Sequence, residues 1–167
     1  MKKLAATIYE KLPQGVGETL YLRVFSFFKI PLINWVGPSV IELSEEKTVI
    51  KIPLNRKTKN HFDSLYFGVL CTGADVAGGL AAMEKIKKSG QKVSLAFKSF
   101  NAEFLKRAEG DTYFTCNQGK EISDFVKQVL SSNERHHLPV KITATCPEKL
   151  GNEPVAEFEL LLSLKKK

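Results

Sequence analysis

The segment from about residue 66 to 88 limits the possible folds of this chain more than any other. It reads as one long helix, and most residues after Phe67 are small or apolar. Glycine and alanine crowd its middle, at Gly73, Ala74, Ala77, Gly78, Gly79, Ala81 and Ala82. Each interior glycine costs a helix about 1 kcal/mol relative to alanine. Several together make sense where a sheet approaches the helix backbone closely, so the segment predicts a central helix covered by a sheet.

The flanking segments supply strands for that sheet. A hairpin is predicted from strands near 39–44 and 47–54 around the polar turn Ser44–Lys47. The alternating segment QKVSLAFKSFNAEFLKRA predicts a long strand, and we interpret GDTYFTCNQ as its hairpin partner. LPVKITATC and PVAEFELLLSL predict two further strands joined by a turn at 147–152.

Helices complete the expected order. Residues 1–35 read as a helical lead-in, broken at Pro13–Gly17, and GKEISDFVKQVLSSN reads as a second amphipathic helix. Gly90 is the expected C-terminal cap of the long helix. Runs of hairpins around one apolar helix favour an α+β fold with an antiparallel sheet curled around that helix. With no repeat or linker, residues 1–167 are expected to form a single domain whose core is 36–167.

The lead-in carries an apolar stripe that includes Leu20, Val24, Phe27 and Phe28. Such a stripe fits either a helix that covers the core or one that lies on a membrane surface. Because basic residues in the lead-in are few, we expect the stripe to cover the core.

Composition leaves several partners open. Lys and Arg number 25 against 18 Asp and Glu, which gives a net charge of +7. The excess suits a solvated surface with the basic tail Lys165–Lys167, or an anionic partner such as nucleic acid, anionic lipid or a phosphorylated small molecule. No nucleic-acid-binding motif accompanies it, so no specific nucleic acid is expected.

The sequence gives little support for a membrane span, a disulfide framework or a metal site. No stretch approaches the roughly 18 consecutive apolar residues of a membrane span. Cys71, Cys116 and Cys146 are odd in number and widely spaced, so we expect reduced, buried thiols and a cytoplasmic location. His136 and His137 are adjacent on a predicted strand and would point to opposite faces, so no metal site is expected.

Asp75 is the one carboxylate in the middle of the small-residue helix. A buried charge is costly unless it is paired or has a function. It is either a structural carboxylate, paired with a lysine or bonded across a subunit interface, or a catalytic group whose pKa is raised by apolar neighbours.

The segment NHFDSLYFG resembles a motif of hotdog-fold acyl-CoA thioesterases of the phenylacetyl-CoA-hydrolase type. In that family Asn-x-x-Gly-x-x-His-Gly-Gly leads into the central helix, and an Asp follows nine residues after the His. Asn60, Gly68 and Asp75 match the Asn, the last Gly and the Asp. In the remaining motif positions, Asp63, Tyr66 and Phe67 replace the first Gly, the His and the next Gly. From about Ile33 to Lys165 the chain is similar to an uncharacterised, thioesterase-like branch of the hotdog superfamily.

The resemblance implies a hotdog fold and roles for these residues. Asp75 would activate water or attack the thioester directly. Asn60 would orient the water or the carbonyl, unless it caps its own loop. Tyr66 would donate a hydrogen bond in place of the His, unless it packs in the core. The backbone N–H groups of Phe67 and Gly68, at the positive end of the helix dipole, would form an oxyanion hole.

The resemblance also implies ligands and partners. The ligand would be an acyl-CoA, bound as substrate and without a further cofactor, and the chain would form a homodimer or a dimer of dimers with sites at subunit interfaces. Basic residues just before the motif would contact the phosphates of coenzyme A, unless they are only a solvated loop; these are Arg56, Lys57, Lys59 and His61. Lys106 and Arg107 are weaker candidates for the same role.

Three functions therefore stand as hypotheses. The first is an acyl-CoA thioesterase that uses Asp75 and the helix N-terminus. The second is a non-catalytic acyl-CoA or fatty-acyl binding protein, which the replacements at Asp63 and Tyr66 make credible. The third is a basic protein that binds nucleic acid or a lipid surface.

Overall fold

The computed structural model describes residues 15–167 and confirms the predicted order of elements. The part of the lead-in before Gly15 lies outside the described residues. The helices are α2 (Val16–Lys29), α3 (Pro31–Val36), α4 (Phe67–Ser89), α5 (Gly119–Leu130) and the short α6 (Pro147–Leu150). The strands are β1 (Ser39–Leu43), β2 (Thr48–Ile52), β3 (Val93–Phe104), β4 (Thr112–Cys116), β5 (Arg135–Thr145) and β6 (Pro154–Lys166). Gly90, with φ 68°, caps α4 as expected.

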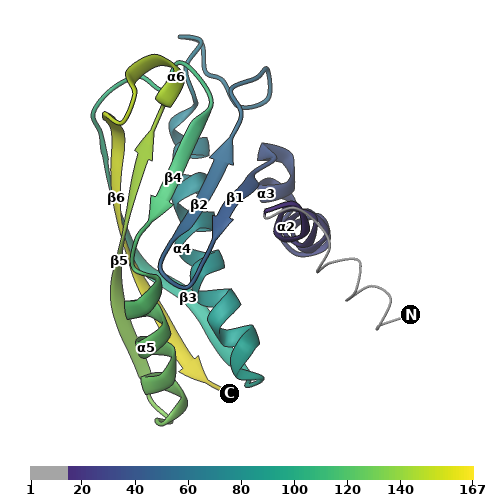
Figure 1. Cartoon of the computed structure of the whole chain (residues 1–167), viewed down its shortest axis with the longest axis vertical. Coiled ribbons are helices and arrows are strands. Elements are labelled where there is room, and N and C mark those ends of the chain that lie inside the picture. The colour runs from purple at the N-terminus through teal and green to yellow at the C-terminus, as the bar shows by residue number, and fades with distance from the viewer. Residues whose placement is uncertain (1–14) are drawn as a thin grey trace.

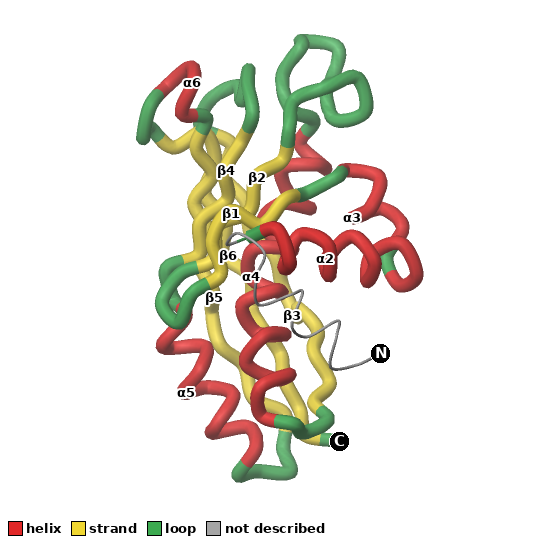
Figure 2. The backbone as a smooth tube through the Cα atoms, turned by 45° about the vertical axis from the view of Figure 1, so that its right-hand side comes forward, coloured by secondary structure: helices red, strands yellow, loops and turns green. Residues whose placement is uncertain are grey.

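The strands form one antiparallel sheet in the order β1-β2-β4-β5-β6-β3. The sheet curls around α4, and α2 and α3 stand out on one side of the molecule (Figures 1 and 2). A curled antiparallel sheet around a long central helix is the hotdog fold, so the predicted fold class is confirmed. None of the helices within 15–167 has the length and hydrophobicity needed to cross a membrane.

The predicted β3–β4 hairpin is wrong. β3 pairs with β6, and β4 lies between β2 and β5. Strand length explains the difference, because the 12-residue β3 finds a partner of matching length in the 13-residue β6, whereas β4 has only five residues. β3 is therefore an edge strand, exposed over most of its length.

The glycines of α4 differ in how closely the sheet approaches the helix backbone at each of them. A Cβ atom added at Gly73 would lie 2.4 Å from the Phe114 ring on β4, so the sheet does approach the helix backbone closely there. The same atom at Gly78 would lie 3.5 Å from Ile142, an ordinary contact. Close packing thus accounts for Gly73 and leaves Gly78 unexplained.

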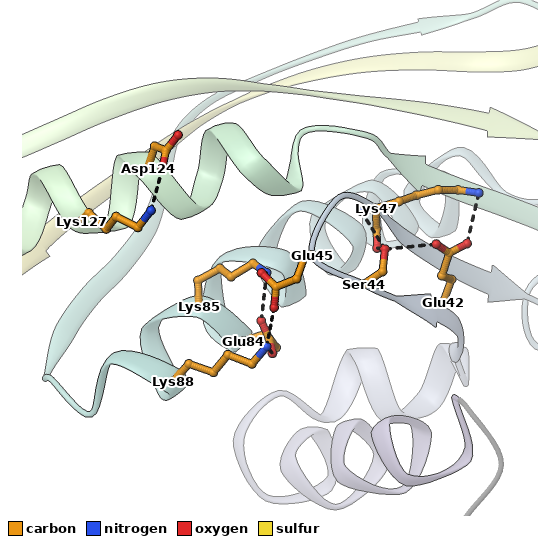
Figure 3. Close-up of polar contacts among 9 residues, drawn as sticks. All are labelled: Glu42, Ser44, Glu45, Lys47, Glu84, Lys85, Lys88, Asp124 and Lys127. Carbon is orange, nitrogen blue, oxygen red and sulfur yellow. Dashed lines mark hydrogen bonds and ion pairs between the residues drawn. The ribbon is translucent and has the colours of Figure 1, made fainter.

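The far end of α4 is tied to the turn between β1 and β2 by charges (Figure 3). Lys85 is buried on α4, and its Nζ atom lies 2.5 Å from a carboxylate oxygen of Glu45 in that turn. Lys88 contacts Glu45 and Glu84 at 2.6 and 2.7 Å. The two lysines lower the pKa of Glu45 to about 2. These ion pairs hold the hairpin turn against the helix.

The apolar stripe of α2 faces outward, which contradicts the expectation that it covers the core. Leu20, Val24, Phe27 and Phe28 are all exposed, with Phe28 at 73%. The helix instead contacts the rest of the molecule through Gly17, Leu22 and Ser26. The helix was predicted correctly and its orientation was not, because apolar residues occur on more than one of its sides.

Candidate functional site

An apolar cavity of about 550 Å³ lies between α2, α3, α4 and β3. Its walls include Tyr21, Phe25 and Ile30 from the N-terminal segment, Val76, Gly79 and Leu80 from α4, and Leu95 and Phe97 from β3. Among the lining residues between 15 and 167, Asp75 is the only acidic one and Lys87 the only basic one. A cavity of this size with a few polar groups is typical of a small-molecule site.

Asp75 lies half-buried in this lining. Within residues 15–167 its carboxylate has neither an ion pair with a lysine nor a hydrogen bond. Burial raises its pKa above the ordinary value of an aspartate. Pairing with a lysine within residues 15–167 therefore does not explain Asp75. A carboxylate of raised pKa beside an apolar cavity can accept a proton from water.

The N-terminus of α4 presents unused backbone donors. Tyr66 is the N-cap, and its carbonyl accepts hydrogen bonds from the N–H groups of Val69 and Leu70. In the described part of the chain, the N–H groups of Phe67 and Gly68 donate to no acceptor. They are available to an anionic group, and the helix dipole adds positive potential at this position.

Asp75 and these donors do not meet within one chain. Asp75 follows Phe67 by eight residues, which places it about 12 Å along the helix axis. None of Asn60, Tyr66, Phe67 and Gly68 lines the Asp75 cavity. The two halves of the predicted site thus lie too far apart to act together on one thioester.

Asn60 organises its own loop. Its Oδ1 atom accepts hydrogen bonds from the Phe62 N–H at 2.9 Å, the Ser64 N–H at 3.3 Å and the Ser64 hydroxyl at 3.2 Å. This is the loop-capping arrangement that sequence left open as an alternative. Its role in orienting water or a carbonyl stays a prediction.

Asp63 keeps a glycine-like backbone. Its φ of 56° is the only positive value among the non-glycine residues described. Aspartate tolerates this left-handed conformation better than most residues. Lys59 forms an ion pair with the Asp63 carboxylate and lowers the pKa of that carboxyl group. The replacement of the expected glycine at this position therefore leaves a turn of the kind that glycine favours.

Tyr66 is 47% exposed, so it is not a core residue. Its ring lies beside the Phe67 ring, with centroids 4.8 Å apart, and covers Gly68, where an added Cβ would lie 2.7 Å from it. Its predicted role as a hydrogen-bond donor to substrate remains a prediction.

The basic loop before α4 is exposed and partly engaged. Lys57 lies over the Trp35 ring at 4.7 Å, Lys59 pairs with Asp63, and His61 stacks on Phe62. Arg56 is exposed. Lys106 and Arg107 were the second pair of basic candidates. The guanidinium of Arg107 lies 4.8 Å from the centroid of the Phe62 ring in this loop, and Lys106 pairs with Glu153. The fold thus brings Arg107 beside the loop that contains His61, near the N-terminus of α4.

Sequence reasoning missed the walls of the cavity. Tyr21, Phe25 and Ile30 come from the lead-in, which was expected only to cover the core. Their apolar character gave no signal of a cavity, because core and cavity walls use the same residues. No group of three or more His, Cys, Asp or Glu residues between 15 and 167 is placed to hold a metal ion.

Solved structures with similar folds come from several bacteria. A protein of unknown function from Chlorobaculum tepidum TLS has a TM-score of 0.77 at 14% identity, over 92% of this chain and 98% of that one. A protein from Pseudomonas aeruginosa, described as a "Probable Thioesterase", has a TM-score of 0.72 at 21% identity, over 93% and 97%. A thioesterase from Haemophilus influenzae has a TM-score of 0.62 at 16% identity, over 86% and 88%.

These likenesses establish the fold alone, because all three structures are at most 21% identical to this chain. None of the curated proteins compared with it matches the chain. A family model covers residues 17–158, which is most of the chain. The chain therefore belongs to the family described as Domain of unknown function (DUF4442).

Proposed function

We propose that this protein hydrolyses the thioester bond of an acyl-CoA, with the acyl chain in the apolar cavity and Asp75 as the general base. One observation carries the proposal: Asp75, the only carboxylate that the described residues contribute to the lining of an apolar cavity of about 550 Å³, is half-buried and has a raised pKa. Structural roles for such a group require a partner, and the described residues of its own chain provide none.

The proposed reaction is a direct attack by water. Asp75 accepts a proton from water as the water oxygen bonds to the thioester carbonyl carbon. The negative charge that develops on the carbonyl oxygen needs hydrogen-bond donors. Collapse of this intermediate breaks the C–S bond, and the sulfur leaves as the coenzyme A thiol after taking up a proton. The products are a fatty acid and free coenzyme A.

A second copy of the chain would supply the donors. Phe67 and Gly68 of the same copy lie about 12 Å along α4 from Asp75, too far to bind the same carbonyl. β3 is an edge strand whose outer side lacks a pairing partner within residues 15–167. An open edge of 12 residues is a ready template for another strand.

The position of β3 favours this arrangement. Val93, Leu95, Ala96 and Phe97 of β3 form one wall of the cavity, so a copy paired along β3 would lie next to it. Phe100 and Phe104 are exposed on the same strand, at 37% and 48%, and pairing would cover them. We infer a homodimer in which Asp75 of one copy and the α4 N-terminus of the other share one site.

The test is thiol release from a panel of acyl-CoA thioesters of increasing chain length. Asp75→Asn should lower kcat by about 10²–10⁴-fold, the usual contribution of a general base. Phe67→Pro removes one proposed donor and should lower kcat by about 10²–10³-fold. Proline suits this position because it is the first residue of α4 and Tyr66 before it has an extended ψ of 139°.

Phe67→Ala is the matched control, because it removes the same ring and keeps the N–H. Activity in Phe67→Ala much closer to wild type than in Phe67→Pro would support the donor role. No turnover on any chain length, or an Asp75→Asn protein as active as wild type, would refute the hydrolase.

A non-catalytic acyl-CoA binding protein is the second candidate. The observation that favours it is the engagement of Asn60 Oδ1 within its own loop. This function predicts a rise in melting temperature with acyl-CoA and no release of thiol. In that case each CH₂ added to the chain should tighten binding about fourfold until the cavity is full.

A further inference from the structure

The most unusual surface of the described chain is an apolar face on its two N-terminal helices. On α2 it consists of a stripe at helical spacing, and on α3 of two residues one turn apart; its members are Val16, Leu20, Val24, Phe27, Phe28, Leu32 and Trp35. Each is at least 47% exposed, and Phe27, Phe28 and Leu32 exceed 60%. We call this the α2–α3 apolar face. Figure 2 shows that α2 and α3 themselves project from the body of the molecule on one side.

The helix α2 exposes more large apolar side chains than it buries. Its buried side contains Gly17, Leu22 and the fully buried Ser26, whereas two adjacent phenylalanines point outward. Phe27 and Phe28 contact each other edge to face, with centroids 5.0 Å apart. Large exposed apolar patches mark sites of interaction with a protein or a membrane.

The charges around the face distinguish between these two kinds of partner. α2 and α3 contain one acidic residue, Glu18, which accepts a hydrogen bond from the Gly15 N–H at the start of α2. It precedes Phe27 by nine residues, or about 14 Å along the axis. The other end of the face is basic. Lys29 lies in the last turn of α2, and Lys57 lies over the Trp35 ring at 4.7 Å with exposed Arg56 next to it.

Aromatic side chains beside exposed lysine and arginine are the composition of helices that lie in the interface of an anionic membrane. Each basic residue near such a surface adds to the electrostatic attraction. We propose that the α2–α3 apolar face docks on an anionic lipid surface, with Phe27, Phe28, Leu32 and Trp35 inserted and Lys29, Arg56 and Lys57 among the headgroups.

The helices proposed to dock on the lipid also form one wall of the cavity. Tyr21 and Phe25 of α2, and Ile33 of α3, line the space that contains Asp75. Docking would therefore bring the cavity to the lipid surface, where long acyl chains partition. The docking proposal does not depend on hydrolysis, since lipid binding can be measured without substrate.

Trp35 provides an intrinsic probe, because it is the only tryptophan of the chain and lies on the proposed face at 59% exposure. The full chain would be mixed with vesicles of phosphatidylglycerol and phosphatidylcholine, and with vesicles of phosphatidylcholine alone. We expect co-flotation with the anionic vesicles, a blue shift of the Trp35 emission, and quenching by brominated lipid. Binding should weaken with added salt and with phosphatidylcholine alone.

Phe28→Ser should lower the partition constant about tenfold, and Phe27→Ser/Phe28→Ser about a hundredfold. Ile41→Ser is the control, because it removes an exposed apolar side chain from β1, outside both the proposed face and the β3 edge. Circular dichroism would verify that each variant is folded.

Unchanged Trp35 emission with anionic vesicles would overturn the proposal. An equal loss of binding in Ile41→Ser and Phe28→Ser would do the same. A blue shift that depends on protein concentration without lipid, and that Phe28→Ser abolishes, would show that a second copy covers the face instead.

Discussion

Asp75 opposes stability at the position where the proposed reaction places its general base. Burial in the cavity lining raises its pKa, so the folded state disfavours its charged form. The described residues of its own chain contain no cation paired with it, so that cost is not offset there. Asp63 shows the complementary case, in which the residue type changes and the backbone does not, since its φ of 56° is the conformation that glycine prefers.

The raised pKa of Asp75 predicts that Asp75→Asn is more stable than wild type near neutral pH. An aspartate whose folded pKa is raised contributes stability below its unfolded pKa, and this contribution is lost as pH rises through the folded pKa. Asparagine is neutral throughout. Thermal melts of both proteins between pH 3 and pH 8 should show the largest gain at high pH, shrinking to nothing below about pH 4.

Asp75→Glu, which keeps the titrating group, serves as the control and should show no comparable gain. A lower melting temperature for Asp75→Asn at pH 7 would contradict the account and point to a stabilising partner of the charge.

At the scale of elements, α4 was the most predictable part of the chain and β3 the least. The small residues and Gly90 fixed the extent of the helix, because burial on nearly all sides leaves a clear composition. The partner of β3 could not be read from the sequence, since strands adjacent in the chain usually pair and these do not. The sequence also could not show that the apolar stripe of α2 faces solvent, because periodicity does not indicate which side of a helix faces the core.

The contact between α4 and β4 predicts opposite effects for two glycines. Gly73→Ala should destabilise the protein by about 1–3 kcal/mol, because its methyl group would overlap the Phe114 ring. Gly78→Ala should stabilise it by up to about 1 kcal/mol, because the added methyl group has room and alanine favours the helix. Urea denaturation of both variants measures this difference. Equal effects of the two substitutions would refute the idea that sheet contact selects Gly73.

At the scale of the whole molecule, the sequence named candidate site residues but not how the fold arranges them. The spacing of Asn60, Gly68 and Asp75 located the α4 N-terminus and the buried carboxylate. The spacing implied about 12 Å of helix between Phe67 and Asp75. It did not indicate that the lead-in forms a wall of the cavity, or that Asn60, Phe67 and Gly68 lie outside it. Those features depend on which elements of the fold come together, and on copies of the chain that would join along β3.

A mixing experiment tests this central claim most directly. Asp75→Asn and Phe67→Pro proteins, each expected to be inactive, would be unfolded together, refolded, and assayed for thioester hydrolysis. If each site combines Asp75 of one copy with the α4 N-terminus of the other, half of the random dimers contain one intact site. The mixture should then regain about a quarter of wild-type activity. No recovery in a mixture shown to contain mixed dimers would contradict a shared site.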